Sequence, residues 1–279
     1  MAGDVKQNTG SWLEHLPPSI KRCRYEGEQQ FHGVLDAQYY QVQHGDASEW
    51  LLFEVSENIF SRDFINGNEQ STPWSSFSAT EELLLVKMMT YEHAAALGAF
   101  GNALIQALGP MGLGMALQAY SGATIKGKDE KKSKQSDNGW GPLRLPHGHD
   151  RKWPTTVLEV AVSEAQPKLQ SDVRFWLHEG QGKVKLVFTL TVDRQSPRIT
   201  IEKWELKPYG DRGHRTQQVT VYQGGNKRMY TTGTPLVIEF CKLFLRDPTV
   251  PREKDIEFGE DDLKALATSI WLAQGFDVR

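Results

Sequence analysis

Cysteine is nearly absent from this sequence: only Cys23 and Cys241 occur among its 279 residues. Two cysteines far apart do not make the disulfide framework of a small secreted domain, and their spacing suggests no zinc site. We therefore expect two free thiols in a reducing compartment. The opening stretch MAGDVKQNTG is polar, without an apolar signal region, and no run approaches membrane-spanning length. These absences predict an intracellular protein of the cytoplasm or nucleus with no membrane partner.

An excess of charge of one sign is also missing. The 32 Lys and Arg residues are balanced by 35 Asp and Glu residues, which gives a formal net charge of −3. This balance provides no long-range attraction to a polyanion, so contact with nucleic acid would depend on a local patch. The glycine-rich pieces GPMGLG and YQGGNK lack the strand and helix context of a phosphate-binding loop. No GxSxG or Cys-His arrangement is present.

The stretch Trp153 to Leu206 has the clearest pattern: a strand, a helix and two further strands. Residues Thr155 to Val162 predict a strand rich in β-branched residues, and a single acid, Glu159, interrupts it. Burying a carboxylate without a partner costs several kcal/mol or forces protonation. The fold must therefore supply a cation, a metal ion or hydrogen-bond donors to Glu159.

Other elements are predicted on both sides of this stretch. Residues 34–43 and 49–60 read as two strands, and a helix begins after Thr80 and reaches Leu108, either continuous or broken near Thr90. GATIKGK predicts a short strand, and KDEKKSKQSDNGWGP a hydrophilic turn that contains Asp137. Residues 111–120 predict a short helix and residues 236–246 a strand or a helix. EDDLKALATSIWLAQ, from Glu260 to Gln274, predicts an amphipathic helix.

The ordered set of motifs resembles a known family. YEHAAALGAFGNAL, QSDNGW, PTTVLEVAVSE, DVRFWL and GKVKLVFTL together are similar to the PD-(D/E)XK restriction-endonuclease-like superfamily. The resemblance is greatest to bacterial Uma-type endonucleases and to fungal relatives with a similar SDN-W, VLEV-SE and IEKWE layout. It covers residues 91–206 and, more loosely, residues 235–274. Each motif is short and degenerate, so the order of the set carries the resemblance.

The resemblance implies an α/β or α+β fold with a restriction-endonuclease-like core: a central mixed sheet with a helix on each face. We assign residues 1–79 to a strand-rich N-terminal extension, 80–207 to the nuclease-like core and 208–279 to a C-terminal helical extension. The chain is long enough for one large domain or two small ones. Because no long polar linker separates the three parts, we expect one compact unit.

The resemblance also implies a metal site with two acids. The first family acid, after a hairpin, corresponds to Asp137, and the second, inside the next strand, corresponds to Glu159. Mg²⁺ or Mn²⁺ is the implied cofactor, because a hard cation needs few carboxylates when waters and a phosphate oxygen complete its shell. Such an ion activates water and stabilises charge on the cleaved phosphodiester.

The family lysine is missing from its usual place. The motif has lysine two residues after the second acid, where this sequence has Ala161. In the bacterial relatives that lysine lies on the following helix. A helical projection of residues 165–179 puts Lys168 and Asp172 at one border of the buried stripe. We therefore predict Lys168 as the catalytic replacement, although the resemblance implies a lysine nearer Asp172.

Each of these residues also has a structural interpretation. Asp137 lies in an Asp-Asn-Gly sequence that favours turns, and Glu159 could be neutralised by a nearby Arg or Lys. Lys168 and Asp172 have the i, i+4 spacing of a surface ion pair. His93, beside Glu92 on the predicted helix, is more typical of a packed interface than of a catalytic base.

Two further polar features are expected to lie in loops. His147 and His149 have a spacing that suits a metal ion, but no third ligand stands nearby. The lysine-rich run from Lys126 to Lys134 adjoins Asp137 and is expected to be a solvated loop, which could meet a phosphate backbone.

Two functions remain open from the sequence. The first is a metal-dependent nuclease that hydrolyses DNA, with Asp137 and Glu159 holding the metal ion and Lys168 assisting the attacking water or the charged intermediate. A homodimer is compatible with this function, because cutting both strands often needs two sites. The second is a catalytically inactive nuclease-like scaffold that serves as a binding or interaction module, which Ala161 and the absence of a strong basic face favour.

Overall fold

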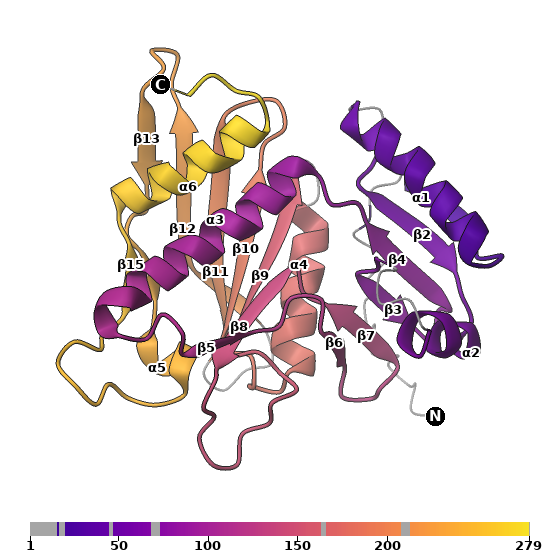
Figure 1. Ribbon diagram of the computed structural model, residues 1–279, viewed down its shortest axis with the longest axis horizontal. Helices are drawn as coiled ribbons and strands as arrows, with labels where there is room; N and C mark the ends of the chain where they lie inside the picture. Colours follow the sequence, from indigo (N-terminus) through magenta and orange to yellow (C-terminus); the bar gives the residue numbers. More distant parts are fainter. Residues whose placement is uncertain are drawn as a thin grey trace, which may run out of the picture.

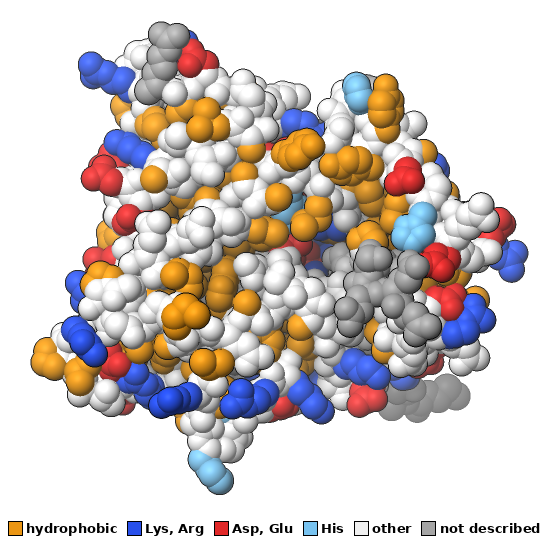
Figure 2. Space-filling view, in the orientation of Figure 1, with side chains coloured by type: hydrophobic (Ala, Val, Ile, Leu, Met, Phe, Trp, Pro, Cys, Tyr) orange, Lys and Arg blue, Asp and Glu red, His pale blue; other side chains and the backbone are white. Residues whose placement is uncertain are grey.

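The computed structural model describes residues 16, 20–44, 47–67, 73–162, 166–207 and 213–278. The chain forms two lobes, each built on one sheet (Figure 1). A seven-stranded sheet forms the centre of the larger lobe, and a six-stranded sheet forms that of the smaller lobe. A notch separates the two lobes at the top of the space-filling view (Figure 2).

The seven-stranded sheet is mixed and has the strand order β13-β12-β11-β10-β9-β8-β5. Strands β9 and β10 run parallel, and the other neighbouring pairs are antiparallel. Its strands are β5 (Leu117–Ala119), β8 (Asn138–Pro142), β9 (Thr156–Val162), β10 (Leu186–Val192), β11 (Arg198–Leu206), β12 (Gly213–Gln223) and β13 (Met229–Thr232).

Helices cover both faces of this sheet because its central strands are buried on both faces. Every residue of β9 is buried, which requires a covering layer on each side. Helices α3 (Tyr91–Leu108) and α6 (Glu260–Ala273) lie on one face, and α4 (Gln166–Arg174) lies on the other (Figure 1). A π-helical turn, Phe175–Glu179, continues α4. Since α4 connects β9 to β10, it provides the crossover that a parallel pair needs.

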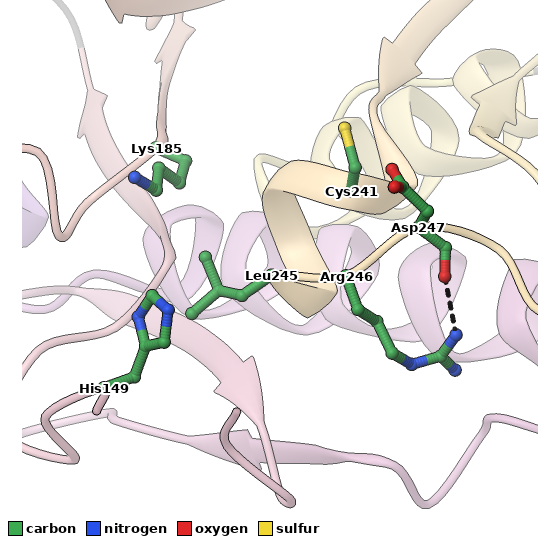
Figure 3. A pocket seen from close by; sticks show the side chains of 6 residues that line it. All are labelled: His149, Lys185, Cys241, Leu245, Arg246 and Asp247. Atoms are coloured by element: carbon green, nitrogen blue, oxygen red, sulfur yellow. Dashed lines mark hydrogen bonds between the residues drawn. The ribbon is translucent and has the colours of Figure 1, made fainter. Parts of the chain in front are cut away.

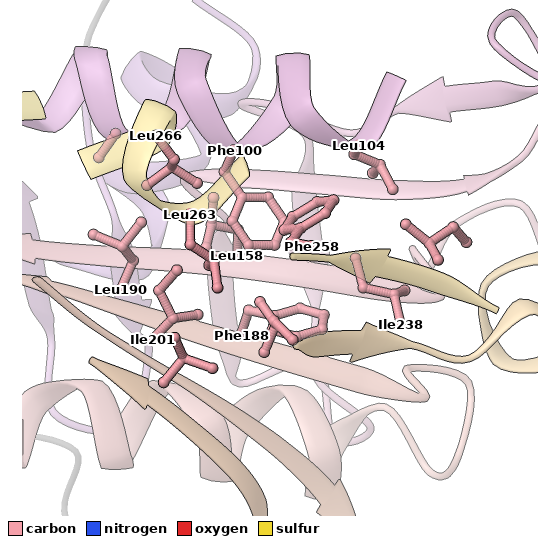
Figure 4. Packing of buried hydrophobic residues seen from close by; sticks show 14 of the residues in the cluster. Phe100, Leu104, Leu158, Phe188, Leu190, Ile201, Ile238, Phe258, Leu263 and Leu266 are labelled. Carbon is pink, nitrogen blue, oxygen red and sulfur yellow. The ribbon is translucent and has the colours of Figure 1, made fainter. Parts of the chain in front are cut away.

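Helix α3 is held against the sheet by aromatic packing. Phe100 lies within 5.8 Å, centroid to centroid, of the rings of Trp140, Phe188 and Phe258. Figure 4 shows Phe100 above Phe188, with side chains of α6 and of the sheet around them. The Thr90 side chain caps the helix by accepting a hydrogen bond from the backbone N–H of His93.

The six-stranded sheet has the order β1-β2-β4-β3-β7-β6. Its strands are β1 (Lys21–Arg24), β2 (Trp50–Glu54), β3 (Ser76–Ser78), β4 (Leu83–Lys87), β6 (Thr124–Lys126) and β7 (Lys132–Gln135). Helix α1 (Glu28–Gln43) and the short α2 (Glu57–Ile59), which continues into a π-helical turn at Phe60–Ile65, pack on it around Phe31, Phe53 and Phe77. The hairpin β6–β7 belongs to this sheet, although in sequence it lies between β5 and β8, which belong to the larger sheet.

Four small elements complete the described fold. A 3-10 turn (Gly109–Met111) ends α3, and strands β14 (Leu236–Ile238) and β15 (Ile256–Phe258) pair with each other beside the larger sheet. Helix α5 (Phe240–Phe244) lies between them in sequence.

The predicted fold class is confirmed. The chain forms a mixed sheet with helices on both faces, which is consistent with a restriction-endonuclease-like core. The strand around Glu159, the two strands after α4 and the helix at residues 260–274 all lie where the sequence predicted them. The run of residues 236–246 contains both a strand and a helix.

Several predicted elements were wrong. Residues 34–43 belong to helix α1, whose buried residues recur at spacings of three and four. Residues 83–87 form a strand, and the helix predicted to begin after Thr80 begins only at Tyr91. The prediction failed because a short apolar run does not distinguish a strand from a helix. Residues 117–119 form strand β5. The lysine-rich run, expected to be a solvated loop, forms part of the hairpin β6–β7.

By length and composition alone, Tyr91–Met111 could cross a membrane. The expectation that no run approaches that length was therefore wrong. In the structure this segment is α3, which packs on α6, β9 and β15.

We expect Phe100→Ala to lower the free energy of unfolding by roughly 3–5 kcal/mol, because it opens a cavity under α3. Asn102→Ala, at an exposed position of the same helix, should change it by no more than about 0.5 kcal/mol. Urea unfolding followed by circular dichroism measures both. Equal effects of the two substitutions would contradict this packing.

Candidate functional site

The candidate site lies where the two sheets meet. The chain leaves β7 of the smaller sheet at Gln135 and enters β8 of the larger sheet at Asn138, so Asp137 lies in the crossing segment. Asn138 pairs with Leu158 of β9. Extending this antiparallel register by one residue brings Asp137 opposite Glu159. The fold therefore brings the two predicted acids to neighbouring positions.

Asp137 is surrounded by donors. Its Oδ2 accepts hydrogen bonds from the backbone N–H of Val160 at 2.7 Å and from Lys87 Nζ at 2.6 Å. His93 Nε2 lies 3.3 Å from the same oxygen. Burial disfavours the ionised carboxylate, but Lys87 and His93 outweigh it and hold the pKa of Asp137 well below its usual range. Asp137 therefore stays negatively charged at neutral pH.

His93 is fully buried at the start of α3. Burial, reinforced by the charge of Lys87, lowers the pKa of His93. The ring is therefore neutral at neutral pH and contacts Asp137 without adding a charge. His93 thus lies at a packed interface, and its neighbour there is the predicted acid Asp137.

Glu159 is only 1 % exposed on strand β9. Its Oε1 accepts a hydrogen bond from Trp176 Nε1 at 2.6 Å and lies 3.3 Å from Lys134 Nζ. Burial raises the pKa of Glu159 to about 7 against the opposing charge of Lys134, and Asp137 raises it further. Glu159 therefore changes protonation near neutral pH, and it has the basic partner that the structural interpretation required.

Lys168 lies on α4 and pairs with Asp172, as the spacing predicted. The pair is buried rather than on the surface, with exposed fractions of 1 % for Lys168 and 3 % for Asp172. Burial lowers the pKa of Lys168 to about 8, although Asp172 opposes this. Within the described part of the chain, the ion pairs of Lys168 go to Asp172 and not directly to Asp137 or Glu159.

Lys134, and not the predicted Lys168, is the lysine that lies next to the second acid, Glu159. Its Nζ lies 2.9 Å from Asp172 Oδ1 and 3.3 Å from Glu159 Oε1. Burial disfavours its charge, but Asp172 and Glu159 outweigh this and hold the pKa of Lys134 above its usual value. The lysine beside the acids thus comes from hairpin β6–β7 and not from α4.

Glu49 is a further acid at this junction. It is buried just before β2, and neither carboxylate oxygen completes a hydrogen bond within the described residues. Burial raises the pKa of Glu49 to about 7, while Lys87 opposes the shift and Asp137 adds to it. The neighbouring Trp50 ring has Lys87 Nζ 5.1 Å and Lys168 Nζ 5.3 Å from its centroid, both in the cation–π range.

Four residues of this cluster were not identified from the sequence: Glu49, Lys87, Lys134 and Trp176. Lys87 carried the same signal as Glu159, a single charge in an apolar run, but the run was assigned to a helix. Lys134 is one of several lysines in a polar stretch, and only the pairing of β7 with β3 shows that it is buried. Ala161 is buried against Leu169, so no basic group occupies the usual lysine position.

The donor chemistry of the site suits a hard divalent cation, which uses oxygen ligands and needs only one or two carboxylates. Asp137 and Glu159 supply two carboxylates from neighbouring segments. Among the described residues, however, no three His, Cys, Asp or Glu groups come together in a way that could hold a metal ion. Each acid is paired with a lysine ammonium group instead. An ion at this position would have to compete with those lysines.

A separate surface hollow of about 360 Å³ lies away from these acids, and its lining includes His149 and Cys241. Figure 3 shows that the labelled side chains point in different directions rather than toward one point. Arg246, at one side, is paired with Glu253. His147 and His149 are exposed in the loop between β8 and β9. The polar side chains that line this hollow therefore do not converge on a common point where a ligand would bind.

Comparisons with known proteins give a structural similarity. No family model matches the chain, and no curated protein matches it. The chain is similar to the crystal structure of a candidate nuclease of family DUF820 from Anabaena variabilis, with 12 % sequence identity and a TM-score of 0.39. The similarity covers 71 % of this chain and 92 % of that one. This degree of similarity assigns neither a family nor an activity.

We expect Glu49→Gln to change how stability depends on pH. The pKa of Glu49 is about 7 when folded and 4.5 when exposed, so the native state loses stability as pH rises from about 4.5 to about 7. Glutamine cannot ionise. The variant should therefore gain stability relative to wild type between pH 5 and pH 8, as measured by urea unfolding.

Glu54→Gln is the matched control, because Glu54 is exposed at the end of the same strand β2. It should leave the pH dependence unchanged. If the difference in unfolding free energy between wild type and Glu49→Gln is the same at pH 5 and at pH 8, Glu49 does not ionise in this pH range.

Proposed function

We propose that this protein is a metal-dependent nuclease of the PD-(D/E)XK type that hydrolyses phosphodiester bonds in DNA. The observation that supports it best is the convergence of Asp137 and Glu159, 22 positions apart in the chain, in one buried cluster with lysines around them. In the proposal, these two carboxylates hold Mg²⁺ or Mn²⁺. The finer resemblance to Uma-type and fungal proteins stays a prediction.

The residues of the cluster have complementary roles in this proposal. The bound ion would activate water and neutralise charge on the phosphodiester. Asp137 stays ionised at neutral pH because Lys87 and His93 stabilise its charge. Lys134, 3.3 Å from Glu159, supplies positive charge where negative charge develops on the phosphate. Lys168, predicted to assist the attacking water or the charged intermediate, is linked to Lys134 through Asp172.

The electrostatics favour a functional site over a purely structural one. Replacing a buried ion pair with apolar residues is often neutral or stabilising, so such pairs are poor devices for stability alone. Here three acids and three lysines are buried together: Glu49, Glu159, Asp172, Lys87, Lys134 and Lys168. Asp137 lies beside them, with a side chain that is 10 % exposed. Strongly shifted pKa values are typical of catalytic clusters, and those of Glu49, Glu159 and Lys168 are strongly shifted.

The inactive scaffold is the second candidate, and one observation favours it. Each predicted acid already has a lysine partner from the smaller lobe, Lys87 for Asp137 and Lys134 for Glu159. In a scaffold, these ion pairs would join the two lobes and no catalysis would be required of them. Catalysis by the wild-type protein distinguishes the two candidates.

DNA is the proposed partner of the active protein, and a homodimer would allow both strands to be cut. Because the net charge is −3, DNA contact would depend on local basic side chains. Several Lys and Arg side chains follow the lower edge of the molecule in Figure 2. Such a row could contact a phosphate backbone.

We expect cleavage of plasmid or single-stranded DNA with Mg²⁺ or Mn²⁺, and none in EDTA. Asp137→Asn and Glu159→Gln should each reduce the rate by roughly a hundredfold or more, because they remove charge at the reacting centre. Asp129→Asn, an exposed acid in the turn of hairpin β6–β7, is the control and should cleave at the wild-type rate. Circular dichroism checks that each variant is folded.

Activity that survives in folded Glu159→Gln would indicate a contaminating nuclease. If the wild-type protein cleaves neither substrate with either ion, the scaffold function is supported instead.

A further inference from the structure

Helix α3 presents an uncharged face to solvent. Within Tyr91–Met111 the only Asp, Glu, Lys or Arg residue is Glu92, near the N-terminal end. This segment is apolar enough to cross a membrane, yet only 28 % of its apolar stretch is buried inside the protein. In Figure 2 the surface over the middle of α3 is white and orange, without blue or red side chains. An exposed apolar face of this kind is typical of an interaction surface.

The face has large side chains on both sides of a bare centre. Tyr91, Gly98 and Ile105 follow one another at intervals of seven residues, so they lie along one line of the helix, with about 10 Å between neighbours. Tyr91 is 71 % exposed and Ile105 is 40 % exposed. A Cβ atom added to Gly98 would meet no other atom within 4 Å. The helix backbone is therefore open to a close approach at Gly98.

We propose that this face of α3 is an interface with a second copy of the same chain, in which the two α3 helices run antiparallel about a two-fold axis at Gly98. Rotation about that axis places Tyr91 of each copy opposite Ile105 of the other. The two Gly98 backbones meet at the centre and let the helices approach closely. The interface goes beyond the proposed function, because it forms whether or not the acid cluster hydrolyses DNA.

The absence of charge on the face favours a second copy over other partners. In a two-fold interface, a residue near the axis meets its own counterpart, so a charge there would meet the same charge and repel it. The single acid of α3, Glu92, is six residues from Gly98. Nucleic acid would require Lys or Arg on the face, and a helix lying on a membrane surface is typically rich in them. Antiparallel helices also place opposite ends of their dipoles together.

The association of the full chain can be measured by sedimentation velocity over a range of protein concentrations, without DNA or metal ions. Wild type should form dimers. Gly98→Glu should raise the dimer dissociation constant by roughly a hundredfold or more, because two carboxylates meet at the axis and lose hydration without a counter-charge. Ile105→Glu should raise it by roughly tenfold or more, since it buries a charge against an apolar side chain. Both positions are exposed in the single chain, and circular dichroism checks that both variants fold.

Gly33→Glu is the matched control. Gly33 is also an exposed glycine within a helix, α1, and a Cβ atom added there would also meet nothing within 4 Å. The exposed positions around it include the acids Glu28 and Asp36, so two copies meeting there would bring like charges together. This variant should dimerise as wild type does.

Each contrary outcome overturns a stated part of the proposal. A dimer that survives both Gly98→Glu and Ile105→Glu, or that Gly33→Glu weakens equally, would overturn the assignment to α3. A monomeric wild-type protein would overturn the interface itself. Flotation with phosphatidylcholine and phosphatidylserine vesicles tests the other occupant: binding by a monomer that Gly98→Glu abolishes would make the face a membrane contact instead. The cleavage assay measures hydrolysis of DNA separately from all of these results.

Discussion

The burial of unlike charges at the junction of the two sheets is the constraint on which this structure depends. Lys87 and Lys134 belong to the smaller sheet, while Glu159 and Asp172 belong to β9 and α4 of the larger lobe. Taking such groups out of water costs several kcal/mol per ion. The cost is offset only when the lobes are docked, because each lobe then supplies the counter-charge that the other lacks. Docking and charge neutralisation are therefore one event.

The same constraint divides the acids into two kinds. Asp137 has strong donors on one oxygen and stays ionised, whereas Glu159 and Glu49 are left near the midpoint of their titration at neutral pH. Neighbouring carboxylates with separated pKa values are the arrangement by which enzymes assign different tasks to similar groups. A structural role alone would not require this difference, since one well-paired acid would join the lobes as well.

The sequence predicted the parts of the fold whose patterns are local. Strand β9 and helix α6 follow directly from their periodicity, and Glu159 was identifiable because a lone acid in an apolar strand needs a partner. The location of Lys134 depends on non-local pairing of β7 with β3, which periodicity does not encode. Helix α1 was mistaken for a strand because its tyrosines and valines favour strands, while its apolar face follows helical spacing. The same non-local pairing explains why Lys134, and not the predicted Lys168, lies beside Glu159.

The hairpin β6–β7 has a consequence for how the chain can be divided. It leaves the larger lobe after β5, completes the sheet of the smaller lobe and returns to β8. A cut between residues 79 and 80 would separate β3 from its neighbour β4, and would leave both with open hydrogen-bonding edges that invite aggregation. The lobes are interleaved along the polypeptide, so neither can be excised as an autonomous fragment by a single scission.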